Sequence, residues 1–291
     1  MLVHGNNLEQ KEAGLDKYSD AKSKAYLAEI RTKYDEWSAR NLNLTGPFVD
    51  SMADDAKVIA ERVALLNDYK DFLDQQHFAE HFDSRSNLHS SVMEEFIYYL
   101  FRDLVEAISK SALIGKSHSF KDVFFRPASF QDMVTNTNAF VEKKDHDFAI
   151  GATLNVTLHV EGQPLSNVVS DQWQIPAVAI ECKTYLDKTM LQDVSTAAEQ
   201  LQMKNPNALY IVVSEWLKLT ENVNLRKFKI DQIYVLRKQK NTDREYRYID
   251  SYVKNPIYDD VVLDLFELVR THLTTDWSGS IADGLNKGIL I

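Results

Sequence analysis

Glu181 and Lys183 close an apolar run of the sequence, "IPAVAIECK", where charged side chains are unusual. The valine, isoleucine and alanine residues of this run, bounded by Pro176, predict a buried strand. Ionised side chains are rarely buried unless they are paired or coordinate a metal. A carboxylate and an ammonium two residues apart at the end of this strand therefore indicate a chemical site.

A second strand of similar design lies upstream, in "KDHDFAIG". Side chains alternate across a strand, so Glu181 and Lys183 share a face with small alanines. Asp147 likewise shares a face with Ala149 and Gly151. If the two strands pair, we expect Asp147 and Glu181 to converge beside Lys183.

Two carboxylates around one point suit a hard divalent cation. Mg²⁺ commonly takes one or two protein carboxylates and completes its octahedron with waters and substrate phosphate oxygens. Such an ion can polarise a phosphodiester and acidify an attacking water. Lys183 would place a compact cation near that water or near the charge that develops on the phosphate. Asp147 and Glu181 are therefore the expected metal ligands, and Mg²⁺ the expected metal.

The Glu-x-Lys pattern alone is weak, because it recurs at 9–11 and 142–144. Only the copy at 181–183 ends an apolar strand and follows an aspartate that opens another strand. A helical segment and a further strand follow it. The competing interpretation is an exposed Glu–Lys pair at a solvated strand edge.

The elements around these strands predict an α/β (α+β) fold with a mixed central sheet flanked by helices. Helical spacing marks "KSKAYLAEIRTKYDEWSAR", "AKVIAERVALLNDYKDFLDQQ" and "LHSSVMEEFIYYLFRDLVEAISKSAL", whereas 111–140 is polar and loop-like. Strands are expected at "DFAIG", "TLNVTLHV", "IPAVAIECK", "ALYIVV" and "DQIYVLR", with the helix "TMLQDVSTAAEQLQM" between the third and fourth and "DDVVLDLFELVRTHL" at the end. We divide the chain into a helical N-terminal region, 1–85, a central core, 86–255, and a C-terminal helix and tail, 256–291.

Composition limits the environment and the partners. A single cysteine among 291 residues excludes an intramolecular disulfide and suits a reducing cytosol. No apolar run is long enough to span a membrane, and the N-terminus lacks the apolar segment of a signal peptide, so no membrane partner is expected. The net charge of −10 opposes general affinity for nucleic acid, but residues 224–247 hold eight basic and three acidic side chains. That stretch is either a solvated face or a surface for the DNA backbone.

The order of elements resembles the PD-(D/E)xK nuclease superfamily, whose core is a helix, three antiparallel strands, a helix and a strand. "KDHDFAIG", "IPAVAIECKTYLDKTML" and "ALYIVVSEWLKL" are similar to segments of type II restriction endonucleases of the BbvCI kind, and "EEFIYYLF" and "IDQIYVLRKQ" add to the likeness. The resemblance covers about 60–275.

This resemblance implies a Mg²⁺-dependent subunit that cuts one strand of double-stranded DNA at a short, asymmetric sequence. A second, related subunit would cut the other strand, and a cognate methyltransferase would belong to the same system in the bacterial cytoplasm. Asp147, Glu181 and Lys183 match the catalytic motif. His146 stands where the superfamily signature has proline, and Asp145 competes with Asp147 for the role of first metal ligand.

Two further residues are implied more weakly. The superfamily often supplies a carboxylate from its first helix, where Glu94 borders the apolar stripe and Glu95 points nearly opposite. Gln200, on the helix after the motif, could orient a phosphate or the lysine; for both, a solvated helix surface is the alternative. Basic residues in the polar segment and in the basic stretch are candidates for DNA contacts: Lys116, Lys121, Arg126, Arg226, Lys227, Lys229, Arg237, Lys238 and Lys240.

Other functions remain open at this point. His77, Glu80 and His81 fit the H-x-x-E-H motif of inverted zinc proteases, although no second helix offers a clear third ligand. A DNA-binding partner subunit without cleavage of its own is a second alternative, against which the intact Asp–Glu–Lys set argues. A homodimer acting at a palindrome competes with the heterodimer.

Overall fold

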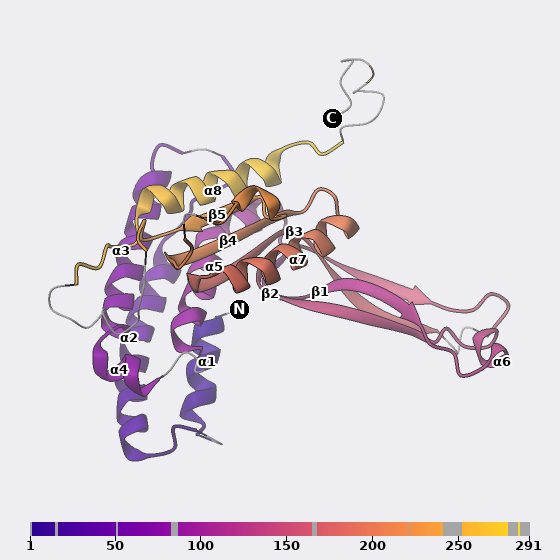
Figure 1. Ribbon diagram of the computed structural model, residues 1–291, viewed down its shortest axis with the longest axis horizontal. Coiled ribbons are helices and arrows are strands. Elements are labelled where there is room, and N and C mark those ends of the chain that lie inside the picture. The colour runs from indigo at the N-terminus through magenta and orange to yellow at the C-terminus, as the bar shows by residue number, and fades with distance from the viewer. Residues whose placement is uncertain are drawn as a thin grey trace.

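Helices fill the N-terminal part of the computed structural model, which describes residues 2–14, 17–50, 52–82, 87–164, 168–220, 222–240, 252–278 and 285. Asp20 caps the second helix, since its carboxylate accepts the backbone N–H of Ser23 at 3.0 Å. Figure 1 shows α1 to α4 grouped on one side of the molecule. In chain order the helices are α1 Val3–Glu12, α2 Ala21–Asn43, α3 Asp55–Leu73, α4 Gln76–His81 and α5 Leu88–Ile108.

Helix α5 links this group to the sheet. Its apolar side chains recur at helical spacing and are fully buried, including Met93, Phe96, Ile97 and Leu100. The helix contacts α1 and α3 as well as β1, β2 and β3. Residues on α5 are therefore held rigidly against the strands that carry the candidate site.

Within the described residues one mixed sheet of five strands has the order β1-β2-β3-β4-β5. β1 and β2 and then β2 and β3 pair antiparallel, whereas β3, β4 and β5 run parallel. The expected mixed sheet flanked by helices is thus confirmed. The strands are β1 Leu113–Phe125, β2 Ala139–Leu158, β3 Val169–Leu186, β4 Leu209–Leu217 and β5 Gln232–Val235.

The interpretation of 111–140 as loop is wrong over β1. This strand lies at a sheet edge and is only partly covered, so "LIGKSHSFKDVFF" carries polar side chains and lacks a continuous apolar run. "DFAIG" and most of "TLNVTLHV", expected as two strands, are parts of the single strand β2. A register shift at Gly151 interrupts the pairing of β2 with β3. A Cβ atom at Gly151 would lie 2.1 Å from the carbonyl oxygen of Ile175, so this close approach of the two strands requires glycine.

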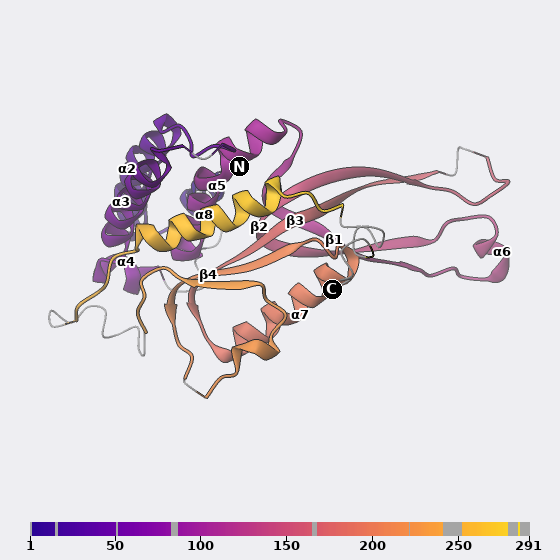
Figure 2. The same ribbon diagram turned by 90° about the horizontal axis from the view of Figure 1, so that it is seen from above.

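The outer parts of β1, β2 and β3 extend from the molecule as an arm, seen at the right of Figures 1 and 2. Figure 2 shows the arm as two hairpins, one of which ends near the short helix α6 Phe130–Met133. β1 also pairs with β3 at Ser119 and Gln174, and the rings of Phe120 and Trp173 stack at 4.3 Å. The two hairpins are therefore joined to each other near the base of the arm.

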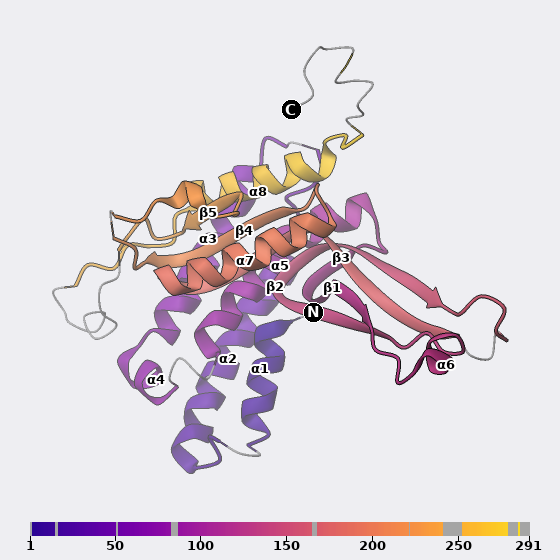
Figure 3. The ribbon, with the colours of Figure 1, turned by 45° about the vertical axis from the view of Figure 1, so that its right-hand side comes forward.

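Helices cover both faces of the central sheet (Figure 3). α7 Lys188–Lys204 packs its apolar side on one face, where Ala179, Leu191, Ala198 and Tyr210 belong to one buried cluster. α5 and α8 Asp259–Thr274 cover the other face, with Phe148, Ile180 and Phe266 in the larger core. None of the described helices is long and apolar enough to cross a lipid bilayer.

The segment before α8 is tied to the N-terminal helices. Asn67 of α3 donates to the backbone carbonyl of Ile257 at 2.9 Å and accepts its N–H at 2.8 Å. The boundary drawn at 256 thus crosses a packed region, and the one drawn at 85 lies outside the described residues. The division into three parts stays a prediction.

Candidate active site

A β-bulge places Asp147 at the point where β2 and β3 separate. Gly115 of β1 pairs with Ala149 and Ser117 pairs with His146, so two residues of β2, Asp147 and Phe148, lie opposite the single residue Lys116. A bulge breaks the two-residue alternation and redirects side chains. The β2–β3 ladder starts with Phe148 opposite Ile180, and Asp147 and Glu181 follow directly where the ladder stops.

Lys183 joins the two carboxylates. Its Nζ lies 3.1 Å from Asp147 Oδ2 and 2.8 Å from Glu181 Oε2. Both carboxylates bond one ammonium, so their oxygens lie within two hydrogen-bond lengths of each other. The backbone N–H of Cys182 also donates to Asp147 Oδ2 at 2.9 Å. The structure thus brings together the three residues that the sequence singled out.

Two buried side chains hold the other oxygen of Glu181. The hydroxyl of Tyr210 donates to Glu181 Oε1 at 3.1 Å, and His146 Nδ1 lies 3.3 Å from the same oxygen. Neither residue was predicted from the sequence. Tyr210 lies in the run "ALYIVV", which shows no sign of chemistry, and His146 was considered only because it replaces proline.

The electrostatics of the two carboxylates differ. Burial acts to raise the pKa of Glu181, but the hydrogen bond with His146 and the charge of Lys183 outweigh it and lower this pKa to about 2. For Asp147 burial prevails over the charge of Lys183, and Glu181 adds repulsion, so its pKa is raised. The pKa of Lys183 is raised because both carboxylates outweigh its burial. Glu181 and Lys183 are therefore charged at neutral pH.

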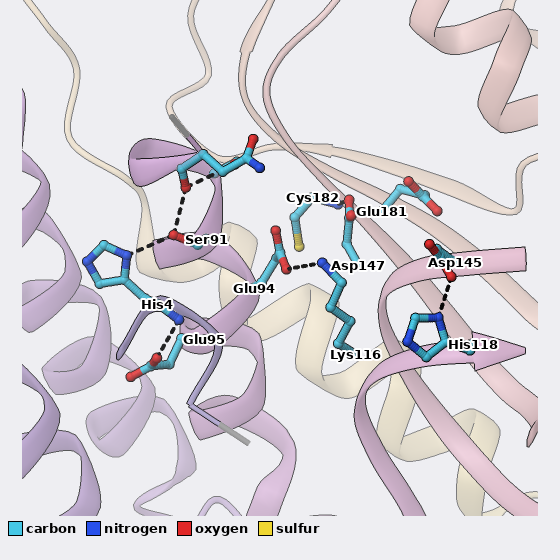
Figure 4. Close-up of polar contacts among 12 residues, drawn as sticks. His4, Ser91, Glu94, Glu95, Lys116, His118, Asp145, Asp147, Glu181 and Cys182 are labelled. Carbon is cyan, nitrogen blue, oxygen red and sulfur yellow. Dashed lines mark hydrogen bonds and ion pairs between the residues drawn. The ribbon is translucent and has the colours of Figure 1, made fainter. Parts of the chain in front are cut away.

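Glu94 of α5 lies beside this group (Figure 4). Its side chain is 8% exposed, and Lys116 Nζ is 3.8 Å from its Oε2. Burial and the nearby Asp147 raise the pKa of Glu94 to about 7. Its neighbour Glu95 points away and accepts the backbone N–H groups of His4 and Gly5 at 2.8 and 3.1 Å.

Two other candidates are not part of the group. Asp145 is exposed and pairs with His118 of β1 (Figure 4). Gln200 is exposed on α7, and none of the described hydrogen bonds joins it to the three residues. Of the competing aspartates, Asp147 alone contacts Lys183 in the described part of the chain.

The candidate DNA contacts divide into groups. Lys116 lies beside Glu94, Lys121 pairs with Glu142 on the arm, and Arg126 lies over the ring of Phe124.

The basic stretch lies toward the opposite edge of the sheet, near β5 and the 3₁₀ helix η3 Leu225–Lys227. Arg226, Lys227 and Lys229 are exposed there, whereas Lys238 pairs with Asp260. The backbone of Lys240 forms an isolated parallel β-bridge with Leu217. Residues 241–247 of the basic stretch lie outside the described part of the chain.

Arg237 requires a correction. Its side chain is fully buried and bonds Glu215 at 3.1 Å, so it is not at a surface that DNA can reach. Glu215 also forms an ion pair with Lys70 at 2.9 Å. A basic stretch in the sequence does not distinguish such a buried, paired arginine from an exposed one.

The histidine motif does not form a zinc site in the described residues. α4 has six residues, and the ring of Tyr26 lies 5.2 Å from His77 and 5.3 Å from His81. His81 Nε2 is 2.7 Å from Ser23 Oγ, and Glu80 accepts from Gln76. No group of three or more His, Cys, Asp or Glu side chains in the described residues could hold a metal ion, so the zinc motif lacks a third ligand.

The absence of a group of three ligating side chains in the described residues also limits which metal ions Asp147 and Glu181 can bind. Two carboxylates are too few for an ion held by protein alone, but they match Mg²⁺, which takes most of its ligands from water and substrate. Both are oxygen donors, as this hard cation requires. The residues therefore fit an ion that binds together with a phosphate, with Glu94 as a further carboxylate nearby.

Comparison with known proteins identifies a matching family and a similar solved structure. A family model described as "Bpu10I restriction endonuclease" matches residues 85–290. A solved structure described as "native BbvCI A2B2 tetramer at low resolution" is similar with a TM-score of 0.69 and 21% sequence identity, over 94% of this chain and 95% of that chain. No curated protein matches.

Proposed function

Because the chain belongs to the Bpu10I restriction endonuclease family, we propose that it is a Mg²⁺-dependent subunit that cuts one strand of double-stranded DNA at a short, asymmetric sequence. The observation that carries the proposal is the position of Lys183 Nζ, 3.1 Å from Asp147 and 2.8 Å from Glu181 at the point where two strands separate.

Each residue of the site has a role in this proposal. Asp147 and Glu181 would hold Mg²⁺, which polarises a phosphodiester and lowers the pKa of a water when it is bound. Lys183 keeps a positive charge beside both carboxylates and would stabilise the negative charge that develops on the scissile phosphate. Glu94 would supply a further carboxylate beside the two metal ligands, and Lys116, half exposed beside it, a cation for a neighbouring phosphate.

The assembly is proposed from the similar structure, which is a tetramer of two kinds of subunit according to its description. By analogy, this chain would pair with a second, related chain, and each would cut one strand. A homodimer at a palindromic site is the competing arrangement. A cognate methyltransferase would protect the same sequence in the bacterial cytoplasm.

The test is cleavage of a plasmid by the purified chain, alone and mixed with a related subunit, in a Mg²⁺ series. We expect both strands to be cut only when both chains and Mg²⁺ are present, and run-off sequencing would give the site and the strand. Full double-strand cleavage by this chain alone would contradict the two-subunit proposal, and cleavage in EDTA would contradict the metal.

A further inference from the structure

We infer that His146 and Tyr210 are positioning residues that fix the orientation of the Glu181 carboxylate for metal binding, an inference that rests on the proposed function. Both contact Glu181 on the oxygen opposite to the one that Lys183 bonds. They therefore act on the site through Glu181.

The contacts occur where water does not compete. Tyr210 is fully buried and His146 is 2% exposed. Their hydrogen bonds to Glu181 Oε1 measure 3.1 and 3.3 Å, and their rings meet edge to face with centroids 5.6 Å apart. An ionised carboxylate only accepts, so the Tyr210 hydroxyl and the His146 Nδ1–H must both act as donors.

Two donors on one oxygen restrict the rotation of the carboxylate. The last torsion of a glutamate is broad and nearly two-fold, so an unsupported Glu181 would sample many orientations. Here Oε1 is held by His146 and Tyr210, which leaves Oε2 directed at Lys183, and Lys183 also bonds Asp147. Carboxylates that bind metals are commonly supported in this way, and losing such a partner typically lowers metal affinity or activity about 10–100-fold.

The backbone keeps both donors in place. Tyr210 pairs with Ala179 in the parallel β3–β4 ladder, two residues before Glu181, and its N–H donates to Asp231 at 2.6 Å. His146 lies beside the bulge of β2, opposite Ser117. The bulge that presents Asp147 to the site thus also directs its neighbour His146 toward Glu181.

The decisive variant is Tyr210→Phe, which removes one oxygen and keeps the ring. Tyr234→Phe is the matched control, because the Tyr234 hydroxyl also donates to a carboxylate, Asp264, at 2.7 Å but on β5, away from the site. We would measure Mg²⁺ binding to each purified chain by calorimetry in the presence of inorganic phosphate, which stands in for the phosphate of DNA. We would also measure the Mg²⁺ concentration for half-maximal cleavage in the presence of a wild-type partner.

For Tyr210→Phe we expect both Mg²⁺ constants to rise about 10–100-fold, with much of the cleavage rate recovered at saturating Mg²⁺. Tyr234→Phe should match the wild type. His146→Asn retains a donor near the position of Nδ1 and should shift the constants less than His146→Ala does.

Wild-type Mg²⁺ constants in Tyr210→Phe would overturn the inference, as would equal shifts in the two tyrosine variants. If the wild type binds Mg²⁺ but does not cleave DNA with any partner, the proposed function fails. The calorimetric comparison still decides the role of Tyr210 in that case.

Discussion

Lys183 and Asp147, which lie on neighbouring strands 36 residues apart in sequence, form an ion pair of 3.1 Å at the base of the arm. Asp147 reaches it from a bulge, and the Cys182 N–H bonds the same aspartate oxygen at 2.9 Å. Burial and the repulsion from Glu181 raise the pKa of Asp147, and the charge of Lys183 opposes both effects. Lys183 therefore keeps two carboxylates close together before any cation reaches them.

Glu94→Gln tests the additional carboxylate. Glu94 Oε2 is buried without a hydrogen-bond partner, so an amide of the same size should leave stability nearly unchanged. We expect the cleavage rate at limiting Mg²⁺ to fall about tenfold or more. Glu106→Gln, an exposed change on the same helix, is the control. Equal rates in the two variants would exclude Glu94 from the site.

Glu215→Ala tests the buried ion network. Glu215 forms an ion pair with Lys70 at 2.9 Å and accepts a hydrogen bond from Arg237 at 3.1 Å, and all three side chains are fully buried. Removing the carboxylate leaves two buried cations without a counter-charge, so we expect the free energy of unfolding to fall by about 3–5 kcal/mol. Urea denaturation measures it. Glu36→Ala, which removes an exposed pair with Lys33, should change it by less than about 1 kcal/mol. A similar small effect at Glu215 would contradict the prediction.

His4 should make stability depend on pH. Its ring nitrogens lie 2.8 Å from Ser91 Oγ and 2.7 Å from Tyr69 OH, and burial followed by the charges of His89 and Lys70 lowers the pKa of His4 well below its usual value. The His4 ring therefore binds a proton more readily in the unfolded chain than in the folded protein. The stabilisation is thus complete above the unfolded pKa of about 6.5 and is lost as pH falls below it.

We expect the free energy of unfolding to fall by up to about 1.4 kcal/mol per pH unit for His4 between about pH 6.5 and 5. Urea denaturation at several pH values would show a smaller slope for His4→Gln than for the wild type. The exposed His159→Gln variant should keep the wild-type slope. Identical slopes in all three proteins would contradict the role of His4.

The sequence predicted the class of the fold through apolar periodicity, which is a local signal, and the family through the resemblance of several segments to known nucleases; both are confirmed. It missed β1, whose exposed edge carries polar residues. The sequence left Asp145 and Asp147 as competitors for the first metal ligand, whereas the structure directs Asp145 to His118 and Asp147 to Lys183.

Contacts between distant segments could not be predicted. Tyr210 lies 29 residues from Glu181 in sequence, and nothing local marks it as a donor to that carboxylate. Arg237 counted toward a basic stretch because its buried partner Glu215 is 22 residues away. In both cases the function of the side chain depends on which strands lie side by side.

The most direct test of the central claim is the cleavage product of Asp147→Ala mixed with a wild-type partner, Mg²⁺ and plasmid. Asp145→Ala is the matched control, since Asp145 pairs with His118 outside the site. We predict that Asp147→Ala binds DNA but yields a nick, always in the same strand, whereas Asp145→Ala still cuts both strands. Cutting of both strands at the normal rate by Asp147→Ala would contradict the assignment of Asp147, Glu181 and Lys183 as the catalytic group.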